Sequence, residues 1–522
     1  ILEEKWDKIS HGLLKHANKS DELEPDITHI KHKMISKGDI TMVNGVQDSV
    51  TLVKNKLKDD VCDNNLPQEA MKNNVTKIAK SPLGEFNGNS VMHSKGSYIT
   101  PIQEFYKGTN IFITGGTGFL GKLLIEKLLY SCPHINMIYM LVRNKKGQSV
   151  ESRAQEIFQD QLFDLFNVAA TVRFDEKLEI AIQTNIQGTR DLMILCRDCR
   201  NIKVVIHVST AYSHCYQNEI KEEFYDVPMT SDKAVKVVEA LDGKILNNIT
   251  PLLLGKWPNT YTYTKAIAED AVRTYGKSLP VGIFRPSIVV STKKEPTAGW
   301  IDNLYGPTGA LVAVGIGMIR TLILNKNAVA DLVPSDMTVN ALISSAWDVY
   351  NRKRCGEEDI PIYNYVSSKE NPIKWDEYIK MNSKHCWNVP FCRSVWTVFF
   401  IPCRLPIIFK FYTFFLHTFP AFIIDAVLYS IGQKPRLLKT YEKLQKFSSM
   451  VSYFTTRQWK FSNSNIQQLW KKLSPEDRLI YDFDFNNLQW DDYFRDTIIG
   501  VRTYILKEDP KTVPQAKRRI YR

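Results

Sequence analysis

A glycine-rich turn, placed between a short apolar run and a helix-like segment, constrains this 522-residue chain more than any other feature. The run Ile111–Ile113 predicts a buried strand, and residues 122–129 have the periodicity of a helix. Gly115, Gly118 and Gly121 lie between them at three-residue spacing. Such a turn lets the backbone approach a pyrophosphate, and the helix N-terminus adds N–H groups and a positive dipole end. We therefore predict a dinucleotide site in a Rossmann-type, doubly wound parallel α/β sheet.

The residues of this turn are the first predicted cofactor contacts. They are Thr114, Gly115, Gly116, Thr117, Gly118, Phe119, Leu120 and Gly121. A tight turn with a purely structural role is the alternative.

The end of the next predicted strand, 137–142, indicates which dinucleotide is bound. Arg143 follows this strand directly, and Lys145 comes two residues later. An acidic residue here would hold the ribose 2′-hydroxyl of NAD, whereas basic side chains suit a 2′-phosphate. We therefore expect NADPH, with Arg143 and Lys145 as contacts; a solvated basic loop is the alternative.

Hydroxyl and amine side chains further along the chain predict carbonyl chemistry. Ser209 and Thr210 close the predicted strand Lys203–Val208, and open α/β sheets bind ligands at the carboxyl ends of their strands. Tyr261 and Lys265 lie four residues apart in a helix-like segment, hence on one helix face. An ammonium beside a phenol lowers the pKa of the phenol. Such a tyrosine can protonate a carbonyl oxygen as hydride reaches the carbon.

The order of these motifs resembles the extended short-chain dehydrogenase/reductases, and longer matches resemble the fatty acyl-CoA reductases, the insect members especially. The resemblance runs from about residue 101 to about residue 510. The matching segments are Tyr106–Gly121, Ala169–Glu176, Asn185–Thr189, His207–Tyr212, Pro258–Lys265, Arg285–Ser287, Gly299–Pro307 and Ala330–Pro334.

This resemblance implies the NADPH-dependent reduction of a long-chain acyl-CoA to an aldehyde and then to a primary alcohol, with release of CoA. By motif position, Tyr261 is the acid, Lys265 its activator and ribose contact, and Thr210 the oxyanion donor, with Ser209 as the alternative donor. Arg285 is a further candidate for holding the CoA phosphates, with a solvated basic face as the alternative. The resemblance also implies further cofactor contacts: Ala169, Ala170, Asn185, Arg285 and Pro286.

The chain departs from the family pattern after its second strand. The family places a third strand, an acidic adenine contact, a helix and a fourth strand before the turn at Ala169. Here about 25 residues separate Arg143 from that turn, and helix-like sequence fills most of them. Since a parallel crossover alone needs a dozen or more residues, we expect a strand–helix–strand portion to be missing near 166–167. A splice form or gene model lacking an exon, a functional shortened fold and a non-catalytic relative are the three explanations.

Composition divides the chain at about residue 100. Residues 1–100 hold 14 Lys, 14 acidic residues and three aromatic residues. So few large apolar groups cannot offset the chain entropy, and we predict a polar, disordered extension with a short helix at 3–17. A small polar domain is the alternative. The net charge of +12 belongs entirely to 101–522 and favours a membrane surface or an anionic ligand. Nucleic acid is disfavoured, since no nucleic-acid-binding motif is found.

We expect an NADP-binding reductase domain at 101–370, a helical, apolar, membrane-associating domain at 371–510, and a basic tail at 511–522. Aromatic residues are dense after 396, but the longest stretch without a charge, 411–424, has fourteen residues, and a spanning helix needs about 20. An interfacial or re-entrant segment, or the wall of an apolar tunnel, is therefore favoured over a plain buried core.

The basic tail favours a membrane location for the chain. Relatives continue past such a stretch into a hydrophobic anchor, and basic residues beside an anchor face the cytoplasm. We expect the endoplasmic reticulum membrane, with the active site in the cytosol; the peroxisomal membrane is the alternative. No metal site is predicted, and the oligomeric state is left open.

Overall fold

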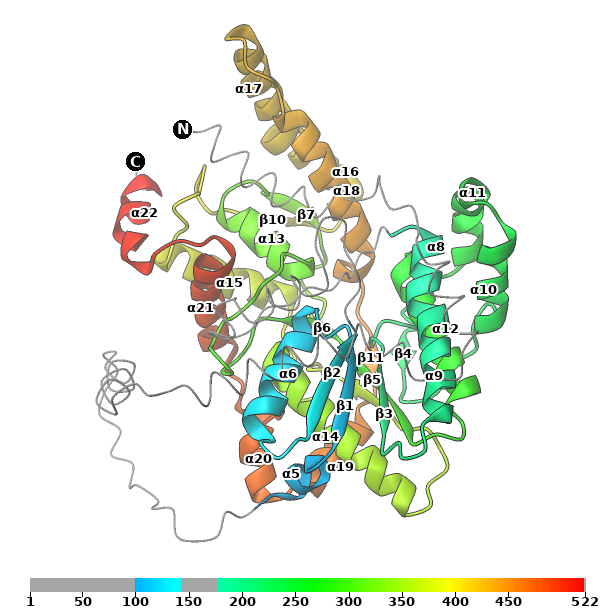
Figure 1. The fold of residues 1–522 in the computed structure, drawn as a ribbon. Coiled ribbons are helices and arrows are strands. Elements are labelled where there is room, and N and C mark those ends of the chain that lie inside the picture. The colour runs from blue at the N-terminus through cyan, green and yellow to red at the C-terminus, as the bar shows by residue number, and fades with distance from the viewer. Residues whose placement is uncertain (1–98, 142–175, 521–522) are drawn as a thin grey trace, which may run out of the picture.

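The computed structural model describes residues 99–141 and 176–520 (Figure 1). Three predictions concern residues outside these ranges: the disordered extension with its short helix, the cofactor contacts Arg143, Lys145, Ala169 and Ala170, and the junction at 166–167.

The named strands pair in parallel throughout the described residues. The largest sheet has the order β3–β5–β9, and a second sheet joins β1 to β2. These strands are β1 (Asn110–Thr114), β2 (Met137–Leu141), β3 (Val205–Val208), β5 (Val281–Pro286) and β9 (Ile362–Tyr365). Short pairs link β4 (Glu219–Ile220) with β11 (Lys460–Phe461), β6 (Ile288–Val290) with β8 (Leu332–Pro334), and β7 (Thr321–Ile323) with β10 (Ile401–Cys403).

Helices cover both faces of the β3–β5–β9 sheet. Successive side chains of β5 point to opposite faces, and those on each face pack with helices in a separate hydrophobic cluster. Val281 packs with Val272 of α12 (Thr260–Tyr275) and with residues of α9 (Gly188–Asp198). Phe284 faces the other way and packs with Val349 of α14 (Ser335–Arg354) and with α19 (Ser464–Lys472). A Cβ on Gly282 would lie 2.6 Å from the Val349 side chain, so this glycine lets α14 approach the strand. This arrangement confirms the predicted doubly wound fold.

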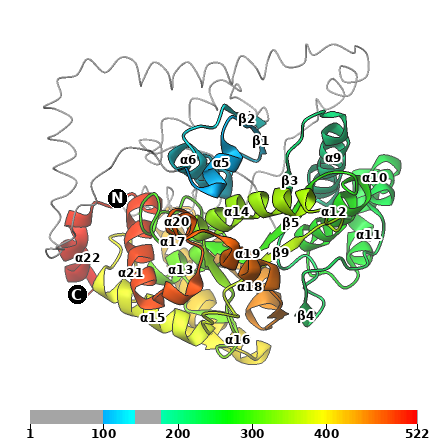
Figure 2. The ribbon, with the colours of Figure 1, turned by 90° about the horizontal axis from the view of Figure 1, so that it is seen from below.

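The parallel sheet is interrupted between β1 and β3. Within the described residues, β1 pairs only with β2, and β3 pairs only with β5. Phe112 of β1 is 48% exposed and Leu141 of β2 is 46% exposed, although strands of parallel sheets are ordinarily covered on both faces. Helix α14 joins the two parts, since it packs against both β5 and α6 (Phe119–Ser131), as Figure 2 shows for α6. Residues 142–175, where the sequence predicts a missing strand–helix–strand portion, lie outside the described ranges, so that portion stays a prediction.

The remaining helices of the first part surround this framework. They are α5 (Pro101–Tyr106), α8 (Leu178–Ala181), the π-helix η2 (Ile182–Gln187), α10 (Ser231–Ala240), α11 (Gly243–Leu254) and α13 (Gly306–Gly315).

The C-terminal part is mainly helical, as predicted. Its helices are α15 (Trp375–Asn388), α16 (Pro406–Thr413), η3 (Phe414–Thr418), α17 (Phe419–Ser430), α18 (Leu437–Thr455), α20 (Pro475–Ile480), η4 (Phe485–Asn487), α21 (Trp490–Gly500), η5 (Val501–Ile505), η6 (Pro510–Thr512) and α22 (Val513–Ile520). Tyr481 and Phe494 share one hydrophobic cluster with Ile113 and Phe284, so this core extends across residue 370. The domain boundary at 370 stays a prediction.

Helices α16, η3 and α17 form one continuous helix, Pro406–Ser430, which projects from the rest of the described chain beside α18 (Figure 1). This helix has 25 residues and is long and apolar enough to cross a membrane, by length and composition only. The charge-free stretch 411–424 covers only part of this helix. The structure shows why that stretch understates the apolar length: Asp425 is buried and accepts backbone N–H groups of Arg436, Leu437 and Leu438 at 2.9–3.0 Å. Asp425 therefore stabilises the start of α18 and leaves the outer face of α17 apolar.

Candidate active site

The glycine-rich turn joins β1 to α6 with the geometry expected of a dinucleotide site. Gly115 has a φ of +67°, which favours glycine, and its carbonyl oxygen accepts the N–H of Gly118 at 2.8 Å. Gly118 precedes the first turn of α6. A Cβ on Gly121 would lie 2.8 Å from the Cα of Gly116, so only glycine allows the helix to pack this closely against the turn. The cradle therefore fits a pyrophosphate that approaches the backbone at the start of α6.

We expect Gly121→Ala to weaken binding of the dinucleotide by at least about 10-fold, which corresponds to about 1.4 kcal/mol. The added methyl group cannot be accommodated unless α6 moves away from the turn. Gly188→Ala is the matched control, because a Cβ at this helical position would meet nothing closer than the Gln183 carbonyl oxygen at 3.7 Å. Fluorescence titration with NADPH measures both variants. Equal affinity in Gly121→Ala and the parent chain would contradict the assignment.

Tyr261 lies beside Thr210, at the carboxyl end of β3. The Asn259 side chain caps the start of α12 by accepting the Thr262 N–H at 2.9 Å, and this places Tyr261 on the first turn. The phenol of Tyr261 and the hydroxyl of Thr210 are hydrogen-bonded. The Ser209 hydroxyl instead donates to the Glu269 carboxylate at 2.5 Å. The structure therefore separates the two hydroxyls that the sequence left as alternatives, and it places Thr210 next to Tyr261.

Burial shifts the pKa values of both Tyr261 and Lys265. Burial raises the pKa of Tyr261 to about 12, and the hydrogen bond with Thr210 opposes this rise. The Lys265 ammonium donates to the Val208 carbonyl at 2.9 Å, and burial lowers the pKa of Lys265 to about 8 while Glu269 opposes this change. Desolvation is the largest cause of the Tyr261 shift, and the prediction that the Lys265 charge lowers the Tyr261 pKa stays a prediction. At neutral pH Tyr261 keeps its proton and can donate it.

We expect kcat/KM for carbonyl reduction to fall as the pH rises past about 8, because the Lys265 ammonium loses its proton there. Tyr261 does not account for such a decrease, since its pKa of about 12 keeps it protonated throughout this range. Lys265→Arg should lower the rate and remove the alkaline decrease, because arginine stays charged. A pH profile of kcat/KM across the neutral and alkaline range measures this, and an unchanged alkaline decrease in Lys265→Arg would assign it to another group.

Arg285 lies in a buried network with Glu269 and not at a phosphate-binding surface. Its guanidinium contacts the Glu269 carboxylate at 2.6 and 2.9 Å and donates to the carbonyls of Lys221 and Glu223 at 3.1 Å. The Arg285 side chain is fully buried. Arg285 holds the pKa of Glu269 well below its usual range, against the opposing effect of burial. These contacts give no support to the prediction that Arg285 binds CoA or cofactor phosphates.

Glu269 is a site residue that the sequence analysis missed. Besides Arg285 and Ser209, its carboxylate contacts the Ser213 hydroxyl at 3.1 Å and the His214 Nε2 at 3.2 Å. It follows Lys265 by four residues on α12, as Lys265 follows Tyr261, so the helical spacing could have indicated it. Glu269 therefore connects the strand end at Ser209 to the helix that carries Tyr261.

Two further predicted contacts also lie beside this helix. The Asn185 side chain, in the π-helix η2, donates to the Thr264 hydroxyl of α12 at 3.0 Å. The Pro286 carbonyl accepts the Ala211 N–H at 2.9 Å, next to Thr210. The glycine-rich turn follows β1, which belongs to a different sheet from β3 and β5 within the two described ranges. The cofactor roles of Asn185 and Pro286 stay predictions.

Comparison with known proteins identifies the family. Two family models match the chain, both described as male sterility proteins: an NAD-binding model at residues 113–167 and 164–342, and a second model, Sterile, at 416–508. The first match divides at 164–167, where the sequence predicts a missing portion. The NAD-binding match, together with the turn before α6, indicates a nicotinamide dinucleotide as the cofactor.

Curated relatives match over most of the chain. It is 38% identical over 466 residues to "Fatty acyl-CoA reductase wat" of Drosophila melanogaster and 37% identical over 473 residues to fatty acyl-CoA reductase 1 of Rattus norvegicus. The human fatty acyl-CoA reductase 1 is 36% identical over 468 residues. Each match covers 81% of this chain and 89% of the relative. The chain therefore belongs to the fatty acyl-CoA reductase family.

Proposed function

We propose that this chain reduces a long-chain fatty acyl-CoA to a primary alcohol with NADPH, through an aldehyde and with release of CoA. The observation that carries the proposal is the Tyr261–Thr210 pair at the carboxyl end of β3, in a chain of this family. Hydride addition to the thioester carbon and loss of the CoA thiolate give the aldehyde. A second hydride and one proton then give the alcohol, so each alcohol consumes two NADPH.

The residues of the chain supply the proton and the positions of the reactants. Tyr261 donates its phenolic proton to the carbonyl oxygen, because its pKa of about 12 keeps it protonated until charge develops on that oxygen. The Thr210 hydroxyl donates a second hydrogen bond to the same oxygen. Lys265, which donates to the Val208 carbonyl, would contact the ribose of a bound cofactor. NADPH supplies the hydride when bound, and Arg143 and Lys145 are its proposed 2′-phosphate contacts.

We further propose that the apolar helix Pro406–Ser430 lies in a membrane surface, which would make 371–510 a membrane-associating domain. Ile407, Phe411 and Phe422 on this helix are 81%, 58% and 60% exposed. An apolar surface this large on a projecting helix is typical of an interaction site. The basic tail at 511–522 supports a cytosolic face of the endoplasmic reticulum; the peroxisomal membrane is the alternative.

Replacing the exposed phenylalanines of this helix should release the protein from membranes. Burying one such side chain contributes roughly 1.5–3 kcal/mol, so we expect the combined change of Phe411, Phe414, Phe415 and Phe422 to Ser to abolish flotation with phospholipid vesicles. Leu479→Ser is the control, because Leu479 is 82% exposed on α20, outside this helix. Flotation of the fourfold variant equal to that of the parent would contradict the proposal.

The test of the function uses this chain in a membrane fraction with a panel of long-chain acyl-CoAs. NADPH absorbance gives the rate, and mass spectrometry identifies the lipid product. We expect two NADPH consumed per alcohol formed. A second form, with a family-like insert after Phe166, is assayed in parallel, because the interruption between β1 and β3 also favours a non-catalytic relative. Turnover by the second form alone would identify the present chain as non-catalytic, and turnover by neither would refute the proposed reaction.

A further inference from the structure

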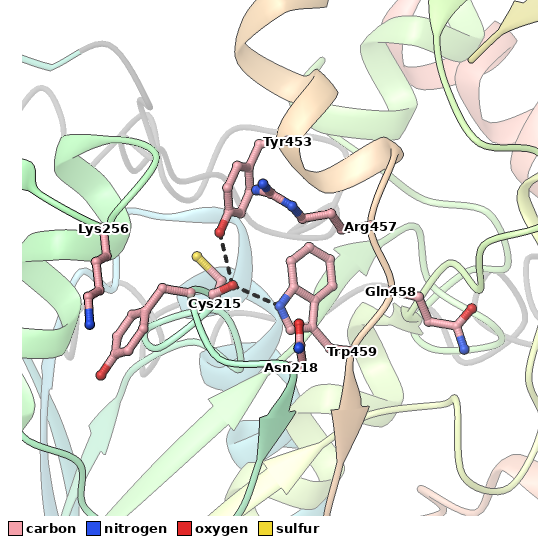
Figure 3. A pocket seen from close by; sticks show the side chains of 8 residues that line it. Cys215, Asn218, Lys256, Tyr453, Arg457, Gln458 and Trp459 are labelled. Atoms are coloured by element: carbon pink, nitrogen blue, oxygen red, sulfur yellow. Dashed lines mark hydrogen bonds between the residues drawn. The ribbon is translucent and has the colours of Figure 1, made fainter. Parts of the chain in front are cut away.

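A cavity of about 460 Å³ lies between the end of α18 and the loop that follows β3 (Figure 3). Its walls come from two distant parts of the sequence. Cys215, Tyr216, Asn218, Lys256, Tyr453, Arg457, Gln458 and Trp459 line it. The indole of Trp459 and the phenol of Tyr453 both donate to the Cys215 carbonyl, at 2.9 and 3.1 Å. These bonds and the pairing of β4 with β11 hold the two walls together.

The cavity carries positive charge on two sides and no carboxylate among its lining residues. Figure 3 shows Lys256 on one side and Arg457 on the opposite side. The Arg457 guanidinium lies 3.7 Å from the centroid of the Tyr453 ring, and the Lys256 Nζ lies 5.8 Å from that of Tyr216. Within the part of the chain that the structure describes, neither cation forms an ion pair with an acidic side chain. A ligand that combines phosphates with a flat ring suits these walls.

The cavity borders the loop that carries the catalytic hydroxyl. Cys215 follows Thr210 by five residues. The side chain of Thr262, the residue after Tyr261, lies beside the thiol of Cys215. The indole of Trp257, next to Lys256, donates to the Ser213 carbonyl of the same loop at 2.8 Å. A ligand in the cavity therefore lies close to the reaction site without occupying it.

We propose that this cavity binds the phosphorylated adenosine end of CoA, with Arg457 and Lys256 pairing with its phosphates. This inference rests on the proposed function. In an acyl-CoA, the flexible pantetheine arm separates the nucleotide from the thioester carbon, so the two ends occupy different places. The cavity holds the nucleotide while the arm leads the thioester to Tyr261 and Thr210. The C-terminal part then contributes Arg457 to the recognition of CoA, and acyl thioesters that lack the nucleotide gain nothing from the cavity.

The test compares two substrates that differ only in the nucleotide: a long-chain acyl-CoA and the corresponding acyl-pantetheine thioester. Removing both cations deletes the charge-assisted hydrogen bonds to the phosphates, so KM for the acyl-CoA should rise by at least about 10-fold. Lys256→Ala with Arg457→Ala should leave the KM values for NADPH and for acyl-pantetheine unchanged. Lys277→Ala, which removes an exposed cation elsewhere, is the control. Equal increases in KM for both thioesters would overturn the proposal.

A binding measurement keeps this proposal separate from the proposed reaction. Isothermal titration with free CoA, dephospho-CoA and pantetheine requires no turnover. The parent chain should bind CoA most tightly, and the double variant should bind CoA and pantetheine equally. Arg457→Gln, which keeps the planar polar end, replaces the double variant if the latter unfolds at a lower temperature. A parent chain that binds CoA no better than pantetheine would overturn the cavity assignment, whether or not the chain reduces acyl-CoA.

Discussion

Replacing Tyr261 by Phe should lower kcat for acyl-CoA reduction by about 10²–10⁴-fold, the range that a positioned general acid contributes. The substitution removes the phenolic proton and the hydrogen bond with Thr210 and leaves the ring in place. Because the aromatic ring is kept, we expect little change in the free energy of unfolding. Steady-state assays with NADPH and an acyl-CoA give kcat, and thermal unfolding shows whether the variant is folded.

Tyr263→Phe is the matched control for this variant. Tyr263 lies two residues further along α12, its ring is fully buried, and its hydroxyl has no hydrogen-bond partner in the described part of the chain. Removing that hydroxyl should leave kcat unchanged and should not destabilise the fold. If Tyr261→Phe keeps the parent kcat, or if the two variants lose activity equally, Tyr261 is not the proton donor.

Replacing Arg285 by Met should destabilise the protein by about 3–5 kcal/mol, because it leaves the Glu269 carboxylate buried without its countercharge. The two side chains are 0% and 2% exposed. The pKa of Glu269 is depressed in the folded chain, so its stabilising contribution is present above the unfolded-state pKa of about 4.3 and is lost as the pH falls. The difference in the free energy of unfolding between parent and variant should therefore be greatest near neutral pH and should decrease as the pH falls.

Urea unfolding of the parent and of Arg285→Met, at neutral pH and at mildly acidic pH, measures this effect. Arg495→Met is the control: its pair with Asp492 is exposed on both sides, at 50% and 64%, and exposed pairs contribute about 0–1 kcal/mol. If Arg285→Met lowers the free energy of unfolding no more than Arg495→Met does, the buried pair with Glu269 does not stabilise the fold as predicted. A difference that grows on acidification would contradict the assigned protonation state of Glu269.

The parts of the site that depend on local sequence could be predicted. The turn at Gly115–Gly121 and the shared helix face of Tyr261 and Lys265 follow from the spacing of a few neighbouring residues. Helices on both faces of the sheet follow from the buried strand runs. The choice between Ser209 and Thr210 could not be made, because it depends on which hydroxyl faces Glu269 and which faces Tyr261.

The sequence was least informative where a distant contact decides the properties of a side chain. Arg285 suggested a phosphate site because the sequence does not show that it is buried against Glu269. The Tyr261 pKa rises because tertiary packing desolvates the phenol, which spacing to Lys265 cannot indicate. The apolar helix was judged too short because Asp425 looked like an interruption, whereas its carboxylate faces the start of α18. Arg285 and Asp425 each have a partner outside their own local segment, and Tyr261 is desolvated by such distant packing.

The interruption between β1 and β3 affects how the abundance of this protein would be controlled in a cell. The glycine-rich turn lies on one side of the interruption and Tyr261 on the other, so a bound dinucleotide that contacts both would bridge the two parts. A ligand that binds only the assembled state stabilises it by mass action. Chains without a bound dinucleotide would open more often and be degraded sooner. The amount of folded protein would then follow the supply of the dinucleotide.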